Sequence, residues 1–268
     1  MQVDRYLRKG RVSVNGTVVR GGAHKFYDTV ELRVDGDVLE ALPLLIAFHK
    51  PKGIVSTLSD DWDRTHLKDV LPATYLQRMH PVGRLDADSS GLLLLSSDGT
   101  LTHKLLQPKF KVEREYECLV EPAEGMPPPG DELVEKLREG VATTDGVFPG
   151  EVTNINGLKV SLIVKEGKYR MVRRMLANAG YPVVELHRTR YGDIVMDENL
   201  QPGQCAPVVG SALTWAQWLR RTCEKKLLVQ GPHPRIRRRM ARKAEGGAQG
   251  GAEEEGETAI ETVIAQQL

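Results

Sequence analysis

Two charged residues stand just before the most apolar stretch of the chain. Arg84 and Asp86 are separated by one residue, so in an extended segment their side chains share one face. They precede residues 92–95, four leucines that read as a buried strand. A charged pair at the mouth of an apolar strand suits a cleft in which a nearby guanidinium holds a carboxylate ionised. The spacing alone favours a simpler alternative, a capping Asp beside a surface Arg.

A second group of residues is strongly basic. Between positions 165 and 190 the chain has seven Lys and Arg residues against two acids, although its net charge is only +1. Such clusters bind nucleic-acid phosphates, and the ring of Tyr169 within this one is suited to stacking on a base. The solvated face of an amphipathic helix explains the composition equally well. The residues of interest are Lys168, Arg170, Arg173, Arg174, His187 and Arg188.

Tyr116 is a third candidate. Residues 116–120 read as a strand, and Arg114 and Tyr116 share one face of it because alternate residues of a strand point the same way. A single tyrosine in such a strand is more often part of the core than catalytic. Spacing therefore leaves its role open.

Conventional catalytic signatures are absent. The chain contains no GxGxxG, GxxxxGK[ST], HExxH or GxSxG pattern. The segment from Asp86 to Gly91 resembles the start of a calcium-binding loop, but its twelfth position is Ser97 and not the glutamate that such loops require. We therefore expect neither a calcium site nor a cofactor of these classes.

Composition narrows the class of protein further. The chain has 268 residues, of which 40% are hydrophobic and 27% charged, as in a soluble globular protein of one large or two small domains. Cys118, Cys205 and Cys223 form no CxxC pair, which fits a reducing compartment without disulfides or a zinc site. The longest apolar run, residues 41–48, is far short of the ~20 residues of a membrane helix. We expect a soluble intracellular protein, with the choice between cytoplasm and an organelle (plastid or mitochondrion) left open.

The pattern of elements predicts an α+β fold: a mainly antiparallel mixed sheet with flanking helices. Short strands and helices alternate without a regular strand-helix-strand repeat. Asn15-Gly16 is a strong hairpin signal. The predicted helices are 3–9, 101–106 and 169–179, and the predicted strands are 30–34, 44–49, 92–95, 116–120 and 160–164.

The end of the chain differs from the rest. Residues 231–268 contain a basic run, then a stretch rich in Gly and Ala, then acids. A segment of this composition buries too little apolar surface to offset its ordering entropy, so we expect a disordered tail. Its arginines are either solvated or form an arm that meets RNA phosphates.

Four segments in this order resemble the motifs of the RsuA-like family of ribosomal RNA pseudouridine synthases. Residues 48–57 look like the first motif, and residues 80–99 like the second, which holds the family's catalytic aspartate. Arg114 to Tyr116 stands in the place of a Lys-x-Tyr motif, and residues 166–175 with 186–188 look like the third. The likeness covers about residues 44–203, and the second motif is the most specific.

The resemblance implies the isomerisation of uridine to pseudouridine in ribosomal RNA. It makes Asp86 the nucleophile, which attacks either ribose C1′ or C6 of the base. It also implies that Arg173 pairs with Asp86, that Tyr116 stacks on the uracil and that Arg84 helps to extrude the target nucleotide. Reactant and product have the same composition, so no cofactor or metal is implied.

The resemblance also divides the chain and assigns RNA contacts. It implies a partial S4-like RNA-binding module over residues 1–42, without that module's usual first helix, a catalytic domain over 43–230 and the tail over 231–268. Two motif positions depart from the family: Arg170-Met171 stands where His-Gln is common, and Arg114 replaces a lysine. The implied RNA-binding residues are Lys50, Lys168, Arg170, Arg174, Arg188, Arg11 and Asn15.

Two rival functions remain at this stage. A non-catalytic RNA-binding ribosome-assembly protein could share the fold, but the presence of Asp86 with Arg84, Tyr116 and Arg173 favours an enzyme. An RNA hydrolase would need a second suitably placed acid or a metal cluster, and neither is evident. The expected partner is ribosomal RNA, free or in an assembly particle, and the expected state is a monomer with no membrane contact.

Overall fold

The structure is a computed structural model that divides into two compact units. One consists of residues 1–43 with 242–268 and the other of residues 44–241. The described residues are 2–21, 25–27, 31–39, 42–59, 62, 64–76, 78–222 and 257–259. Among them, no helix is long and apolar enough to cross a membrane.

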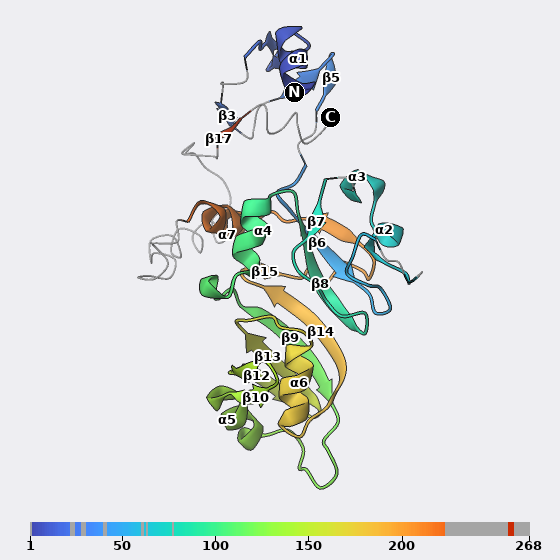
Figure 1. The fold of residues 1–268 in the computed structure, drawn as a ribbon, viewed down its shortest axis with the longest axis vertical. Helices are drawn as coiled ribbons and strands as arrows, with labels where there is room; N and C mark the ends of the chain where they lie inside the picture. Colours follow the sequence, from blue (N-terminus) through green and yellow to red (C-terminus); the bar gives the residue numbers. More distant parts are fainter. Residues whose placement is uncertain are drawn as a thin grey trace. The chain divides into compact units, whose positions relative to one another are not determined.

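The smaller unit contains a short helix and a four-stranded antiparallel sheet (Figure 1). Helix α1 (Gln2–Arg8) accompanies strands in the order β2 (Thr17–Val18), β1 (Val12–Val14), β4 (Leu32–Val34) and β5 (Asp37–Val38). Leu7, Val12, Val14 and Leu32 belong to one small hydrophobic core, because alternate strand residues point to the same face. The hairpin predicted at Asn15-Gly16 joins β1 to β2.

A second strand pair lies in the same unit. The backbone of β17 (Glu257–Ala259) pairs antiparallel with β3 (Lys25–Tyr27). These three tail residues form a strand that the average composition of residues 231–268 does not predict, because a local Thr-Ala-Ile segment follows the glycine-rich stretch. The rest of the predicted disordered tail lies outside the described residues.

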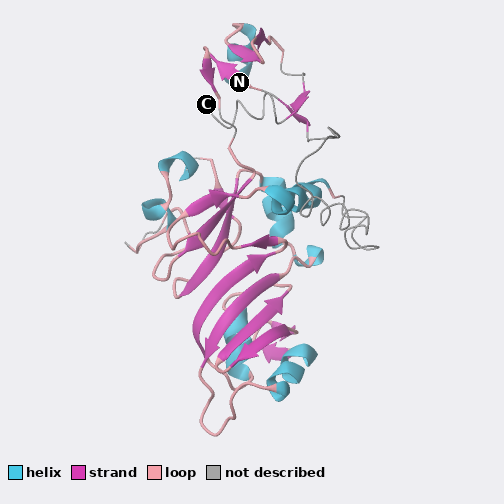
Figure 2. Cartoon of the chain, turned by 180° about the vertical axis from the view of Figure 1, so that it is seen from behind, coloured by secondary structure: helices cyan, strands magenta, loops and turns pink. Residues whose placement is uncertain are grey.

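The larger unit is organised by a nine-stranded mixed sheet (Figures 1 and 2). Strands β14 and β8 are parallel, and the other neighbours along the main path are antiparallel. The predicted fold class is thus confirmed. The path runs β12 (Glu151–Asn156), β13 (Lys159–Val164), β9 (Arg114–Val120), β14 (Val183–Tyr191), β8 (Ser89–Ser96), β6 (Leu45–Lys50) and β16 (Cys205–Pro207), with β15 (Ile194–Val195) beside β14 and β7 (His80–Pro81) beside β8.

The two halves of this sheet are covered differently. In β6 and β8, neighbouring residues enter two separate cores on opposite faces, as Leu92 and Leu93 illustrate. Burial on both faces explains the unbroken leucine run. In β9, Tyr116 and Cys118 are buried while Glu117 between them is exposed, so this half is apolar on one face only. Figure 2 shows the uncovered face of these strands from behind.

Helices complete the larger unit. α6 (Met171–Asn178) contacts β14, and α5 (Asp131–Glu139) contacts β12, whereas α4 (Gly99–Leu106) and α7 (Gly210–Arg221) contact each other. The remaining elements are α2 (Leu67–Val70), α3 (Ala73–Leu76), the 3₁₀ turn Pro108–Phe110 and a hairpin of β10 (Val141–Thr143) and β11 (Gly146–Phe148).

The predicted elements correspond to α1, α4, α6, β4, β6, β8, β9 and β13, with small differences at their ends. The pattern did not predict α5, α7 or β14. Strand β14 carries Glu185, His187, Arg188 and Arg190, so it lacks the apolar alternation of an obvious strand.

Candidate active site

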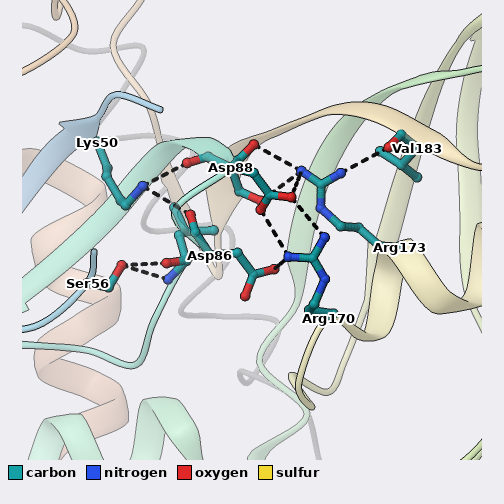
Figure 3. Close-up of polar contacts among 9 residues, drawn as sticks. Lys50, Ser56, Asp86, Asp88, Arg170, Arg173 and Val183 are labelled. Carbon is teal, nitrogen blue, oxygen red and sulfur yellow. Dashed lines mark hydrogen bonds and ion pairs between the residues drawn. The ribbon is translucent and has the colours of Figure 1, made fainter. Parts of the chain in front are cut away.

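Asp86 lies in the loop that leads into β8, and two buried side chains fix this loop (Figure 3). The Ser56 hydroxyl donates to the Leu85 carbonyl at 2.6 Å and accepts from the Leu85 amide at 3.0 Å. Lys50 Nζ donates to the Asp86 carbonyl at 3.1 Å and the Ser89 carbonyl at 2.8 Å. The Asp86 side chain itself is 27% exposed, so a fixed backbone presents a reachable carboxylate.

Lys50 is completely buried at the end of β6. Its third hydrogen bond goes to the Pro51 carbonyl, so all three ammonium donors bind backbone oxygens. Burial lowers the pKa of Lys50 to about 8, although the charges of Asp86 and Asp88 act in the opposite direction. The prediction that Lys50 binds RNA is therefore wrong for this structure, because its ammonium group is enclosed under the Asp86 loop.

Arg170 immediately precedes α6 and reaches the same loop. Its guanidinium forms two hydrogen bonds with the Asp88 carboxylate, at 3.2 and 2.8 Å, and Nη1 lies 3.8 Å from Asp86 Oδ2. Arg170 has a φ of 48°, in the left-handed region that non-glycine residues seldom adopt. The cation beside Asp86 is thus Arg170.

Arg173 contacts the backbone of the Asp86 loop but not the Asp86 carboxylate. Its Nη2 donates to the Asp88 carbonyl at 3.0 Å and to Ser89 Oγ at 3.2 Å, and Nη1 donates to the Val183 carbonyl (Figure 3). Its ion pair, at 3.4 Å, is with Asp88. The predicted Arg173–Asp86 pair is absent among the described residues, because one helical turn places Arg173 on the backbone beyond Asp86.

Asp88 forms ion pairs with both Arg170 and Arg173. Its partial burial would raise the pKa of the carboxyl, but the hydrogen bond from Arg170 and the charges of Arg173 and Arg170 outweigh this, and the pKa is lowered. The Asp88 carboxylate therefore stays ionised and joins α6 to the loop.

A cavity of about 380 Å³ opens beside Asp86. Tyr116 lines it and is 7% exposed, with its hydroxyl 3.5 Å from Arg188 Nη1. Arg84 also lines the cavity, on an exposed position without a hydrogen bond or ion pair to another described residue. Lys168 and Tyr169 lie at the same opening, and Tyr169 is 76% exposed. The predicted group of Arg84, Asp86 and Tyr116 is thus brought together in one cavity.

Arg188 forms part of the cavity wall from β14. It is 3% exposed, and its Nε donates to the Leu92 carbonyl at 2.7 Å. Gly91 makes this approach of β14 to β8 possible, because a Cβ at Gly91 would overlap the Arg188 backbone. Gly91 also has a φ of 106°, which favours glycine.

Comparisons with known proteins agree with this geometry. The family model described as RNA pseudouridylate synthase matches residues 44–178. Ribosomal small subunit pseudouridine synthase A of Yersinia pestis is 33% identical over 211 residues, which cover 77% of this chain and 87% of that protein. The chain belongs to the RNA pseudouridylate synthase family. The predicted resemblance and the predicted enzyme class are therefore confirmed.

Further relatives of this synthase family support the assignment. An uncharacterized RNA pseudouridine synthase of Aquifex aeolicus is 34% identical over 200 residues, covering 74% of this chain and 82% of that protein. A solved structure titled as a pseudouridylate synthase matches with a TM-score of 0.59 and 26% identity, over 81% of this chain and 92% of that one.

Three residues of α6 and β14 were predicted to bind RNA or to belong to the basic cluster of this synthase: Arg174, His187 and Arg188. Arg174 pairs with Asp145 and Thr144 in the β10–β11 hairpin, so it is already bound to protein groups. His187 points away from the cavity face: its Nδ1 lies 2.8 Å from Ser90 Oγ and its ring meets His49 edge-on. Arg188, one residue further along β14, points the opposite way, into the cavity wall, as strand alternation requires.

The RNA contacts predicted for the smaller unit are partly occupied. Arg11 pairs with Asp35 through two hydrogen bonds and lies over the Tyr6 ring. The side-chain oxygen of Asn15 accepts from the Glu31 amide at 2.9 Å. Their role in RNA binding, and the S4-like character of this unit, remain predictions.

Two residues that position the site were missed from the sequence. Ser56 is within the first motif, but nothing in its type indicated two bonds to the loop 29 positions away. Asp88 was assigned only to the rejected calcium loop, although an acid two residues after Asp86 was a signal for a partner of the basic cluster. Cys118 is excluded as a nucleophile because burial raises the pKa of its thiol to about 12.

Proposed function

We propose that this synthase isomerises a uridine of small-subunit ribosomal RNA to pseudouridine, with Asp86 as the nucleophile. The observation that carries the proposal is the placement of Asp86 at a cavity shared with Tyr116 and Arg84, on a loop fixed by Lys50 and Ser56. The RNA assignment rests on the curated relatives, which are named for the small ribosomal subunit.

The chemistry requires an ionised carboxylate that meets one nucleotide. Arg170 Nη1 lies 3.8 Å from Asp86 Oδ2, so a cation stands beside the carboxylate. If the carboxylate attacks ribose C1′, an Asp86–C1′ bond forms as the C1′–N1 bond breaks. The released uracil turns, C5 attacks C1′ and the Asp86–C1′ bond breaks. If the carboxylate adds to C6 of the base, the C1′–N1 bond breaks afterwards, the base turns, C5 bonds to C1′ and the Asp86–C6 bond breaks. On both routes N1 gains a proton and C5 loses one. Tyr116, in the cavity wall, stacks on the uracil and helps to remove the C5 proton.

The nucleotide must leave its stack to reach Asp86. Extrusion costs on the order of a few kcal/mol, which contacts at the opening of the cavity must offset. Arg84 and Lys168 are exposed there and are free to meet phosphates, and Tyr169 offers an exposed ring to a neighbouring base. Arg170 joins them only if it exchanges Asp88 for a phosphate.

The remaining expectations belong to the same proposal. The reaction conserves composition, so the enzyme acts without a cofactor or metal. It acts as a monomer on ribosomal RNA, free or in an assembly particle, and the S4-like unit adds RNA contacts through Arg11 and Asn15. The boundary between the two compact units at residue 43 is consistent with an RNA-binding unit before it and a catalytic unit after it.

The test uses full-length protein on unmodified small- and large-subunit ribosomal RNA transcripts. Pseudouridine is mapped by carbodiimide treatment and primer extension, with and without excess EDTA. A single new stop in the small-subunit RNA, dependent on Asp86 and unaffected by EDTA, is the expected result. A stop in the large-subunit RNA instead would identify that RNA as the substrate. The absence of a stop on either RNA and on precursor particles would favour the non-catalytic assembly protein.

A further inference from the structure

Arg188 is a buried cation without a buried counter-charge. Its guanidinium makes one strong hydrogen bond, to the Leu92 carbonyl, and one long bond to the Tyr116 hydroxyl. Its Nη2 has no partner among the described residues, none of whose carboxylates forms an ion pair with it. Buried charges are ordinarily paired, because desolvation without a partner is costly.

Three other arginines of the unit, the buried Arg114 and Arg173 and the half-buried Arg174, are different. Arg173 and Arg174 each have a nitrogen without a partner, but each pairs with an acid, Asp88 or Asp145. Arg114 donates to three backbone carbonyls and to the Tyr191 hydroxyl, so its hydrogen bonds are well used. Arg188 alone, among these four, lacks both an acid and a full set of acceptors.

The position of Arg188 shows what could complete it. It lines the cavity with Asp86 and contacts the hydroxyl of Tyr116. Its guanidinium lies against two aromatic rings, Tyr116 at 5.9 Å and Tyr191 at 5.0 Å. The Tyr191 hydroxyl is already used by Arg114 and the Leu105 carbonyl. No described side chain is left to supply the missing acceptor, and the cavity that Arg188 lines is the side from which a ligand oxygen can reach the guanidinium.

We propose that Arg188 is a catalytic residue that donates a hydrogen bond to a carbonyl oxygen of the extruded uracil and stabilises the negative charge that forms on it. This inference rests on the proposed isomerisation. If Asp86 attacks C1′, the C1′–N1 bond breaks and its electron pair enters the uracil ring, so O2 and O4 share the charge. If Asp86 attacks C6, the C5=C6 pair moves onto C5 and O4. Either route places negative charge on a uracil oxygen, which a cationic donor at that oxygen stabilises.

A guanidinium whose hydrogen bonds are not all made within the protein can stabilise charge that develops during the reaction. A donor that is desolvated and fixed before the reaction loses little in reorganisation when charge develops, and such donors contribute most in a dry site. The neutral uracil needs the bond less than the anion does. Arg188 therefore acts on the rate of the chemical step more than on RNA affinity.

The first experiment compares Arg188→Met with wild type in single-turnover assays that follow tritium release from C5 of the target uridine. The rate is expected to fall about 10²–10³-fold, as on removal of one oxyanion-hole donor. The Kd for the RNA should change less than about threefold, because the phosphate contacts remain. Arg188→Lys, which keeps the charge and is the second variant if the first fails to fold, should show a smaller decrease in rate.

The second experiment replaces the target with 2-thiouridine or 4-thiouridine, since sulfur is a weaker acceptor than oxygen. In wild type one of the two thio substitutions should reduce the rate. In the Arg188 variant that same penalty should shrink by about tenfold, because the hydrogen bond that the sulfur weakens is already missing. The position that shows this coupling identifies the oxygen. Arg114→Lys, a buried substitution in the same wall, should show no such coupling.

The outcomes separate this inference from the function on which it rests. Wild-type turnover with no coupling at either oxygen, or an Arg188 defect confined to RNA affinity or to melting temperature, overturns the role of Arg188 alone. If wild-type protein releases no tritium from any ribosomal RNA or precursor particle, the proposed function fails, and the role of Arg188 fails with it.

Discussion

The buried and the exposed cations near the cavity are used in opposite ways. We call the buried cations Lys50, Arg173 and Arg188 the floor, although only Arg188 lines the cavity itself. All three bind backbone carbonyls of β8 or of the loop before it. The rim consists of Arg84 and Lys168, exposed and without such bonds. Both groups belong to the basic residues that the sequence alone assigned to RNA or catalysis. Burial, and not residue type, separates them.

This difference shows how a nearly neutral chain positions a carboxylate and still binds a polyanion. Buried cations with short bonds to carbonyls fix the loop that carries Asp86, and their charges are not available to RNA phosphates. Exposed cations keep their solvation and flexibility, so they can meet phosphates at little cost. Arg170 lies between the two groups, with a bidentate contact to Asp88 and a partly exposed side chain.

The largest expected effect separates Asp86 from its neighbour Asp88. Asp86→Asn should lower turnover by about 10⁴-fold or more, because it removes the carboxylate that we propose as the nucleophile. Asp88→Asn removes a similar charge two residues away and should lower turnover by about tenfold or less, since it only loosens Arg170 and Arg173. Single-turnover rates on the ribosomal transcript measure both, and filter binding should show RNA bound by each variant. Equal decreases would remove Asp86 from the nucleophile role.

The next prediction concerns the contribution of a floor cation to the free energy of unfolding. Lys50→Met removes the ammonium donor to the carbonyls of Pro51, Asp86 and Ser89, of which the Asp86 carbonyl keeps its bond from the Ser89 amide. Each buried acceptor left unsatisfied costs about 1–3 kcal/mol. We expect the free energy of unfolding to fall by about 3 kcal/mol at pH 7. Urea denaturation followed by circular dichroism measures this, with Lys168→Met as the matched rim control, expected within about 0.5 kcal/mol of wild type.

The lowered pKa of Lys50 gives the same pair of proteins a pH dependence. Between its folded pKa of about 8 and its ordinary value of 10.5, the unfolded chain binds more protons than the folded chain. Stability rises with pH wherever that holds, so the advantage of wild type over Lys50→Met should widen above pH 8, by at most about 1.4 kcal/mol per pH unit. A gap that stays constant there would show that Lys50 keeps an ordinary pKa, and a gap that narrows would show that the pKa of Lys50 is raised on folding.

The sequence predicted the parts of the site that depend on local pattern. The leucine run of β8, the strand of Tyr116 and the helix after Arg170 each have a periodicity or a turn that indicates them. The motifs in order also identified the family, and the residues they single out, Asp86, Tyr116 and Arg84, line one cavity.

The pairing of charges could not be predicted in the same way. Arg170 and Arg173 are one helical turn apart, so both can reach the loop, and only the left-handed backbone at Arg170 directs that side chain to Asp88 and toward Asp86. Burial of Lys50 depends on the loop folding over the end of β6, a contact 36 positions apart. Such facts belong to tertiary packing, which residue types do not encode locally.

A smaller effect probes the rim through its salt dependence. Arg84→Ala and Lys168→Ala each remove one exposed cation at the cavity opening, so RNA affinity should fall several-fold while the melting temperature stays within a degree or so. The slope of log Kd against log[salt] should decrease by about 0.7–0.9 for each phosphate that the variant no longer neutralises. The floor variant Lys50→Met should leave the slope unchanged. A slope unaffected by either rim variant would place the RNA elsewhere.

The smallest effect concerns the residue between floor and rim. The Arg170–Asp88 contact is bidentate but partly exposed, so a double-mutant cycle with Arg170→Gln and Asp88→Asn should give a coupling energy of only about 0.5–1 kcal/mol. If Arg170 behaves as a rim residue, that energy falls as salt rises about tenfold from low ionic strength, because exposed charges are screened. A coupling that is larger and insensitive to salt would assign Arg170 to the floor. In that case Arg170 would not exchange Asp88 for a phosphate, and its bond to Asp88 would serve only to hold the Asp86 loop against α6.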